Sequence, residues 1–312
     1  MNKLSTKEKF AYGLGEIGSS IVWQGMMFYL GFFYTDVFQI PAAAAGFLLF
    51  VPKFLDALVD PIIGTIADRT NTKHGKFRPY ILWLFIPYSI FMVLTFATPD
   101  LAATGKLIYA YATYMIMMLL YSFIMTPYNA LGGVITSDHV ERTSLQSYRF
   151  FMAFFGGFIV RVLTNPLVAH FGDGLNENKM PLNPQQGFTY TFIVFAVISA
   201  ICFYLTFRYT KERVRPMATQ KSSLKQDLGD LMKNRPWIIL FIVSTLNLLY
   251  VGVFGTATKY YFDYYVTVKE VNLFGWNVGG LDVMSVFNGF SSIVIMLMLI
   301  SPVSTWMANK MG

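Results

Sequence analysis

The segment from Pro52 to Pro61 carries three charged side chains inside a long apolar stretch. Lys53, Asp56 and Asp60 follow one another at spacings of three and four residues, which places them on one face of a helix. An ionised side chain at the centre of a bilayer helix costs about 2.5–3.5 kcal/mol on insertion scales. This face must therefore point into a helix bundle or an aqueous cavity.

Two acids and one lysine leave this cluster with one negative charge in excess. A monovalent cation such as Na⁺ would neutralise the charge, and without one, repulsion and desolvation should favour uptake of a proton. Pro61 has no N–H, so the carbonyl of Ala57 loses its helical partner and could become a further oxygen ligand. The alternative is that Lys53 pairs with Asp56 and only stabilises helix packing. We predict a cation site at Asp56 and Asp60 and no other metal site.

Other apolar stretches carry polar and aromatic side chains that could bind a small polar solute. A guanidinium at a cavity mouth suits sugar hydroxyls or anionic groups, which makes Arg149 a candidate. Arg161 lies deeper in the same stretch and needs an acidic or carbonyl partner. The polar or stacking groups that could join Arg149 are Glu16, Trp23, Gln24, Tyr121, Ser122 and Asn129.

The polar loop from Asp68 to Pro79 has two interpretations. It can be an ordinary basic cytoplasmic loop, or its acid, basic residues and glycine turn can latch neighbouring helix ends in one conformation. The predicted gating residues are Asp68, Arg69, Gly75, Lys76 and Arg78.

The composition identifies the elements that must position these residues as membrane helices. The chain of 312 residues has a mean hydropathy of +0.49, with 55% hydrophobic and 13% charged residues, whereas soluble domains carry about 25% charged residues. A bilayer core needs about 20 mostly apolar residues per helix. The predicted membrane helices cover residues 17–36, 42–67, 79–98, 107–128, 150–170, 188–207, 237–262 and 283–303. We therefore expect an all-α polytopic membrane protein.

The positions of Lys and Arg predict the orientation, because cytoplasmic loops are enriched in both. With the N-terminus inside, 18 of the 24 basic residues fall in inside segments and only Lys106, Lys179 and Lys269 fall in outside loops. The net charge of +7 therefore reflects topology and gives no reason to expect a nucleic-acid partner. Both termini should be cytoplasmic, in a cell inner membrane, and the lipid bilayer is an expected partner.

Two features that are typical of soluble enzymes do not indicate an enzyme in this chain. Gly13-Leu14-Gly15-Glu16-Ile17-Gly18 spells the dinucleotide motif but lacks the strand and βαβ unit that the motif requires. Its glycines should instead allow close packing of helices. The three histidines have no ligand partners at metal spacing, and Cys202 is the single cysteine. We expect neither an enzyme nor a bound cofactor.

The organisation after the sixth apolar stretch predicts a two-bundle transporter. Residues 1–207 should form a six-helix bundle, 208–236 a basic cytoplasmic linker, and 237–312 the first two helices of a second bundle. A second bundle of six helices would need about four more, so the chain is expected to be cut short.

Five stretches resemble the glycoside–pentoside–hexuronide:cation symporters of the major facilitator superfamily. They are Tyr12–Glu16, Tyr34–Asp36, Asp56–Pro61, Gly75–Pro79 and Tyr148–Phe151. The resemblance covers the whole chain. It implies the major facilitator fold, and a sugar or glycoside carried with Na⁺, Li⁺ or H⁺.

The resemblance also implies roles for particular residues. Asp56, Asp60 and the Ser122 hydroxyl match the family's cation site, Lys53 matches a nearby basic residue, and Arg149 matches a sugar-site arginine. The acids on helices one and four of melibiose permease fall at Ser20 and Met125, and its helix-four tryptophan falls at Asn129. The missing helix-four acid favours H⁺ over Na⁺, and Glu16 could partly replace the helix-one acid. The predicted substrate-binding residues are Glu16, Ser20, Trp23, Lys53, Tyr121, Asn129 and Arg149.

We therefore expect a monomeric sugar:cation symporter. The alternatives are an uncoupled facilitator or exporter of another small solute, and a truncated remnant that does not transport.

Overall fold

The computed structural model describes residues 3–174, 181–214, 229, 233–246, 250, 272–273 and 276–277, with the backbone alone for 53–58, 272–273 and 276–277. The chain divides into two compact units, and the described residues up to 214 belong to the first. The described part of the second contains a helix over Arg235–Leu246 and a two-stranded antiparallel hairpin. The strands of this hairpin are β1 (Asn272–Leu273) and β2 (Trp276–Asn277), with Asn272 opposite Asn277.

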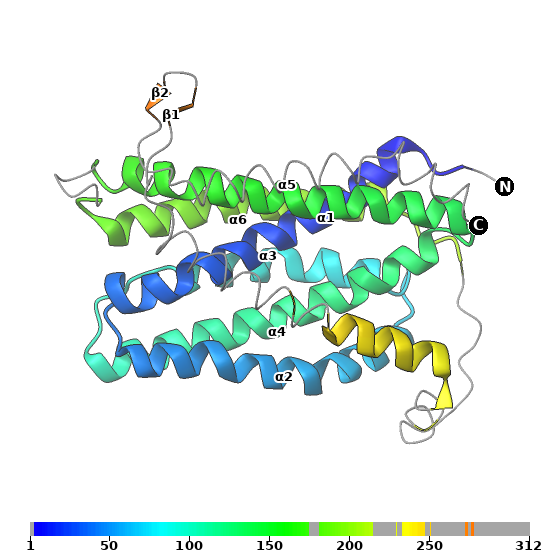
Figure 1. The fold of residues 1–312 in the computed structure, drawn as a ribbon, viewed down its shortest axis with the longest axis horizontal. Coiled ribbons are helices and arrows are strands. Elements are labelled where there is room, and N and C mark those ends of the chain that lie inside the picture. The colour runs from blue at the N-terminus through cyan, green and yellow to red at the C-terminus, as the bar shows by residue number, and fades with distance from the viewer. Residues whose placement is uncertain are drawn as a thin grey trace. The chain divides into compact units, whose positions relative to one another are not determined.

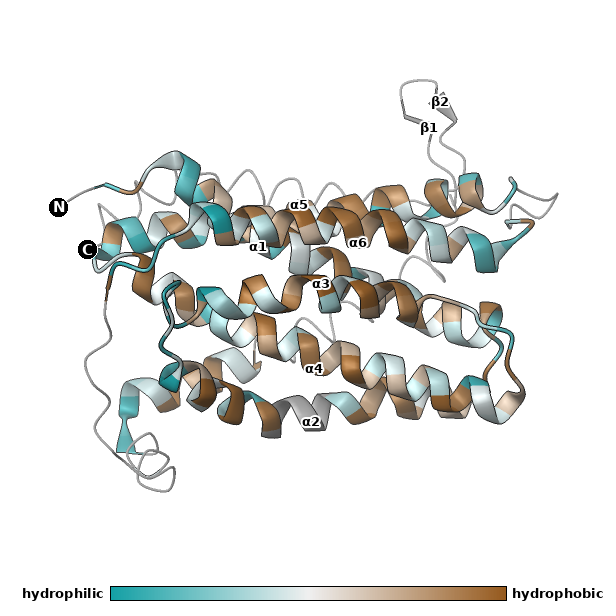
Figure 2. Cartoon of the chain, turned by 180° about the vertical axis from the view of Figure 1, so that it is seen from behind, coloured by the Kyte–Doolittle hydropathy of each residue, from teal (hydrophilic) through white to brown (hydrophobic). Residues whose placement is uncertain are grey.

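The first unit is a bundle of long helices that lie side by side (Figure 1). Its elements are α1 (Thr6–Gly25), two π-helical turns η1 (Met26–Leu30) and η2 (Phe33–Val37), α2 (Ala42–Arg69), α3 (Arg78–Thr95), α4 (Ala103–Ile135), α5 (His139–Phe171) and α6 (Pro184–Tyr209). Within the described residues, α3, α4, α5 and α6 are each long and apolar enough to cross a membrane. Apolar residues fill the middle of these helices, and polar residues gather toward their ends (Figure 2). The expected all-α architecture is therefore present in this unit.

Several helices extend well beyond the apolar stretches that predicted them. The first was expected to begin at residue 17, but α1 begins at Thr6, where the Ser5 hydroxyl caps the amide of Glu8 at 3.2 Å. The fifth was expected at residue 150, but α5 begins at His139 after its N-cap Asp138. The predicted boundaries were wrong because helices continue past the apolar region wherever caps and ion pairs satisfy their polar ends. The predicted helix over 283–303 lies outside the described residues.

Glycines on α1 allow three other helices to approach it closely. A side chain at Gly13 would meet Met152 of α5, one at Gly15 would meet Tyr128 of α4, and one at Gly18 would meet Phe203 of α6. The dinucleotide-like motif therefore serves helix packing, as the sequence predicted.

Helices α2 and α4 run in the same direction. The Tyr111 hydroxyl donates to the carbonyl of Ala44 at 3.1 Å near the start of both helices. Further along both helices, Thr126 lies beside Asp60. Ser122 lies four residues before Thr126, and Asp56 lies four residues before Asp60. The backbones of Ser122 and Asp56 are therefore at about the same level along the bundle.

Candidate substrate and cation site

The acid Asp60 of α2 contacts a hydroxyl of α4. The Thr126 Oγ1 donates to the Asp60 Oδ1 at 3.2 Å, and Asp60 is exposed on the bundle surface. A carboxylate and a hydroxyl are oxygen ligands of the kind that hard cations such as Na⁺ bind, and the same carboxylate could carry a proton. Ser122 is buried one turn before Thr126. The side chains of Asp56 and Lys53 lie outside the described residues, so their predicted roles stay predictions.

The guanidinium of Arg149 is held by residues from two other helices. Its Nε donates to Glu16 Oε2 of α1 at 2.6 Å, and its Nη2 donates to Asn129 Oδ1 of α4 at 2.6 Å. The guanidinium also lies over the Tyr128 ring, 5.2 Å from its centroid. The structure therefore brings together three of the predicted substrate-binding residues, Glu16, Asn129 and Arg149.

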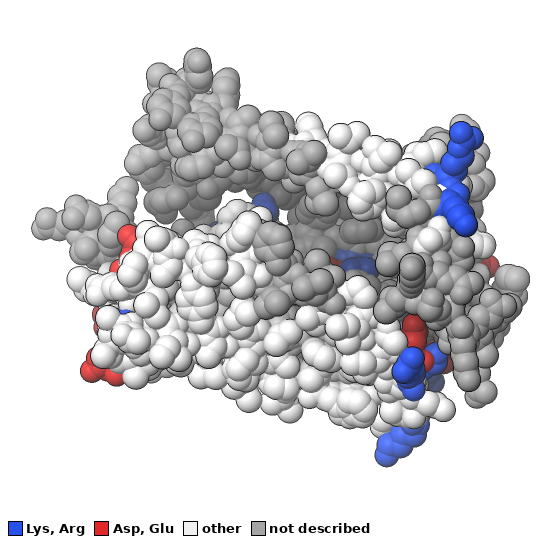
Figure 3. All heavy atoms as spheres, turned by 90° about the horizontal axis from the view of Figure 1, so that it is seen from below, with Lys and Arg blue, Asp and Glu red and all other residues white. Residues whose placement is uncertain are grey.

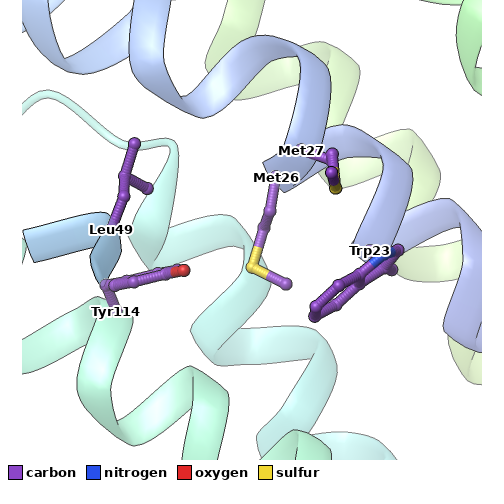
Figure 4. A pocket seen from close by; sticks show the side chains of 5 residues that line it. All are labelled: Trp23, Met26, Met27, Leu49 and Tyr114. Carbon is purple, nitrogen blue, oxygen red and sulfur yellow. The ribbon is translucent and has the colours of Figure 1, made fainter. Parts of the chain in front are cut away.

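Two further predicted residues form an aromatic stack. The rings of Trp23 on α1 and Tyr121 on α4 lie 5.4 Å apart at an interplanar angle of 29°. Trp23 also lines a pocket of about 130 Å³. Figure 4 shows Trp23 and Tyr114 reaching into this pocket from opposite sides, with Met26 between them. The pocket is completed by Met27 and Leu49, so its wall combines aromatic faces with flexible apolar side chains, as is typical of small-molecule sites.

Ser20 and Arg161 have other contacts. Ser20 is buried, and its Cβ packs next to Gly156 of α5. Arg161 was expected to need an acidic or carbonyl partner. Its guanidinium lies over the Phe28 ring, 4.9 Å from the centroid, so a cation–π contact satisfies part of this need.

The predicted gating loop is bound by a residue that the sequence analysis missed. The carboxylate of Glu212 accepts the backbone N–H groups of Lys76, Phe77 and Arg78 at 2.8, 2.9 and 3.0 Å. It therefore caps the start of α3 from a position more than 130 residues later in the chain. Gly75 has a φ of +108°, and a side chain there would collide with the Glu212 carboxylate. Asp68 and Arg69 are exposed at the end of α2.

The segment Lys211–Val214, which we call the strap, binds two further helices at the same end. The backbone N–H groups of Arg213 and Val214 both donate to the backbone carbonyl of Val134 at the end of α4, each at 2.9 Å. Arg213 also forms a bidentate pair with Glu8 of α1, at 2.7 and 2.8 Å. Hydrogen bonding to Glu8 raises the pKa of Arg213 above its usual value. The first residues of the predicted linker are thus bound to the bundle.

Charged residues from four separate segments meet at the end of the bundle where the strap is bound, which we call the strap end. Lys9 of α1 pairs with Glu141 of α5 at 2.9 Å. The strap and the predicted gating loop, which Glu212 joins, lie at the same end. At the start of α5, the N–H groups of Glu141 and Val140 lower the pKa of Asp138. Within the first unit, as drawn in Figure 3, Lys and Arg gather toward one end, and the outer surface of the middle carries few charges. This clustering agrees with the basic loops sharing one side of a membrane, as predicted.

The described residues contain no group of three His, Cys, Asp or Glu side chains that could hold a metal ion. The oxygen ligands at Asp60 and Thr126 could contribute to a site for a monovalent cation, which binds more weakly and with fewer charged ligands.

These features define a polytopic helical membrane protein that holds charged and hydroxyl groups within an apolar bundle. The chain belongs to the MFS/sugar transport protein family, whose model matches residues 11–312. It is a multi-pass membrane protein of a transporter family and not an enzyme.

Three bacterial relatives confirm the resemblance to glycoside:cation symporters. The inner membrane symporter YicJ of Escherichia coli is 43% identical over 86% of this chain and 56% of its own length. YagG of the same organism, named as a candidate glycoside/cation symporter, is 40% identical over 87% of this chain and 57% of its own length. The isoprimeverose transporter of Lactiplantibacillus pentosus is 32% identical over all of this chain and 61% of its own length. The chain spans little more than half of each relative.

Proposed function

We propose that this chain forms the first bundle, and the start of the second, of a transporter that imports a sugar or glycoside together with a monovalent cation. The Asp60–Thr126 contact carries the proposal. An acid exposed within an apolar helix is expensive unless a cation, a proton or water compensates its charge. Here it lies against a hydroxyl of the helix that also provides Tyr121 and Asn129.

The substrate side of the proposal rests on the groups around Arg149. The Glu16–Arg149–Asn129 cluster offers charged donors and acceptors, and the Trp23–Tyr121 stack offers aromatic faces. Sugar rings are bound by such combinations of hydrogen bonds to hydroxyls and stacking of C–H faces on aromatic rings. The names of the relatives, among them an isoprimeverose transporter, support the same substrate class.

We favour H⁺ over Na⁺ as the coupling cation. Met125 is a buried apolar residue of α4, so the described part of this helix offers hydroxyls but no carboxylate near Asp60. Fewer anionic ligands weaken a Na⁺ site, whereas a proton needs only one carboxylate.

Uptake into proteoliposomes tests the proposal. The protein in its natural length should accumulate a labelled glycoside when a proton gradient is imposed, and Asp60→Asn should abolish accumulation while exchange of sugar persists. Asp100→Asn, the same change in an exposed loop, is the matched control and should transport normally. Unchanged gradient-driven accumulation in Asp60→Asn would exclude this cation site, and stronger driving by Na⁺ would exclude the preference for H⁺.

We further propose that the strap end faces the cytoplasm and that the transporter is a monomer in the inner membrane. In a Cys202→Ser background, a membrane-impermeant thiol reagent applied from outside should label a cysteine at Ala103 but not one at Ser137. Both positions are exposed, at the start of α4 and just beyond its end respectively. The reverse labelling pattern would invert the proposed orientation.

A further inference from the structure

The ion pair between Glu16 and Arg149 differs from an ordinary surface salt bridge. The two side chains are only 14% and 18% exposed, and they join α1 to α5 within the bundle. In the described parts of α1, α4, α5 and α6, the acidic residues are Glu8, Glu16 and Glu141. Glu8 pairs with Arg213 and Glu141 pairs with Lys9. Glu16 is therefore the one acid of these four helices that compensates Arg149.

The bonds to Arg149 use one particular edge of its guanidinium. Nε and Nη2 form the edge that a carboxylate binds side-on through two parallel N–H groups. Glu16 occupies Nε and Asn129 occupies Nη2. These bonds use two of the five N–H groups, and the Tyr12 hydroxyl is a further partner of the guanidinium. The guanidinium still has more N–H groups than these three partners require, so it can also donate to a substrate.

The charge of Arg149 is balanced before any substrate arrives. A substrate carboxylate would be attracted by the guanidinium but repelled by the Glu16 carboxylate, 2.6 Å from Nε. It would also lose its own hydration on entering a partly buried site. A sugar hydroxyl meets no charge repulsion, and its loss of hydration costs less than that of a carboxylate, because it can accept from the guanidinium and donate to Glu16 as a neutral group.

We infer that Glu16 determines specificity: by pairing with Arg149 it makes the site select neutral glycosides over sugar acids. The inference rests on the proposed sugar transport and adds the charge class of the substrate. It also adds a second role to any direct contact of Glu16 with the sugar, since its Oε2 binds the arginine.

Matched pairs of sugars test the inference. Binding of methyl glucoside, methyl galactoside and methyl xyloside is measured calorimetrically on the protein in its natural length. Methyl glucuronide and methyl galacturonide differ from the two hexosides only in carrying a carboxylate at C6. The native protein should bind at least one neutral glycoside, and where that glycoside is a hexoside its uronide should bind about tenfold more weakly, which corresponds to about 1.4 kcal/mol.

Glu16→Gln should remove the compensating charge and lower this preference about tenfold, chiefly by strengthening uronide binding. Glu8→Gln breaks the other Glu–Arg pair of α1 and is the matched control, which should leave the preference unchanged. If Glu16→Gln does not fold, the double variant Glu16→Gln/Arg149→Gln replaces it. The double variant carries neither charge of the pair, so it should bind uronides no better than the native protein does.

The outcomes separate the two proposals. If no sugar binds or is transported, the proposed function fails and the inference fails with it. If sugars are transported but the native protein binds uronides as tightly as hexosides, only the inference fails. An equal change for both sugars in Glu16→Gln would also overturn it, since a structural role predicts that result.

Discussion

Helix α1 carries two Glu–Arg pairs about two turns apart, and they differ in how completely the carboxylate is used. At the strap end, Glu8 accepts from both terminal nitrogens of Arg213 and from the N–H of Lys211 at 3.1 Å. About two turns further along α1, Glu16 accepts from Arg149 through one oxygen. The two arginines also differ in burial, since the Arg213 side chain is 46% exposed and the Arg149 side chain only 18%.

This difference indicates why similar pairs can serve different purposes. A carboxylate whose lone pairs are filled by fixed donors holds chain segments together and has little capacity for a ligand. A pair with spare donors and acceptors in a partly buried site can bind a polar solute, and loss of one partner there is more costly. We therefore assign a structural role to Glu8 and a substrate-selecting role to Glu16, and three substitutions test this contrast.

The largest effect on stability is expected for Arg149→Met. It leaves the Glu16 carboxylate partly buried without its cation, which should lower the free energy of unfolding by about 3 kcal/mol. Thermal unfolding in detergent measures the change. The double variant Glu16→Gln/Arg149→Met removes the stranded charge and should recover most of the loss. Equal stability of the single and double variants would show that the stranded Glu16 charge costs nothing, and native stability of both would show that the pair contributes nothing.

A smaller effect is expected at the strap end for Gly75→Ala. The φ of +108° disfavours any residue with a Cβ, and this Cβ would also displace the Glu212 carboxylate from the start of α3. We expect a loss of about 2 kcal/mol in thermal unfolding. Gly46→Ala is the matched control. Gly46 lies inside α2 with no atom within 4 Å of an added Cβ, so alanine should stabilise by about 0.5–1 kcal/mol.

The sequence predicted the parts of this structure that depend on local pattern. Apolar stretches predicted the helices of the described bundle, because a span must bury about 20 apolar residues whatever its neighbours are. The glycines at 13, 15 and 18 were correctly assigned to packing, since no strand preceded them. Glu16, Asn129 and Arg149 were predicted as site residues because each is a polar group at the end of an apolar stretch.

Partners that are distant in the sequence could not be predicted in the same way. Glu212 appeared to belong to a hydrophilic linker, and nothing in its local sequence points to the amides of residues 76–78. Thr126 carries no charge and therefore gave no signal, although it lies beside Asp60. The helix ends were misplaced for a different reason, because the apolar stretches were followed and the local N-caps Ser5 and Asp138 were not used.

The smallest effect is expected for Glu8→Gln. Arg213 is nearly half exposed, so water replaces much of the lost interaction and screens the rest. The glutamine oxygen can still accept from the N–H of Lys211. We expect a loss of about 1 kcal/mol in thermal unfolding, a third of the effect of Arg149→Met.

The decisive comparison for Glu8→Gln lies in the combination of stability and ligand selectivity. If Glu8 only ties the strap to α1, the variant should unfold at a slightly lower temperature and keep the native preference for neutral glycosides. Protease cleavage after Lys211 or Arg213 should become faster, because the strap would detach more often from α1. A changed sugar preference in this variant would instead couple the strap end to the substrate site and remove the contrast between the two pairs.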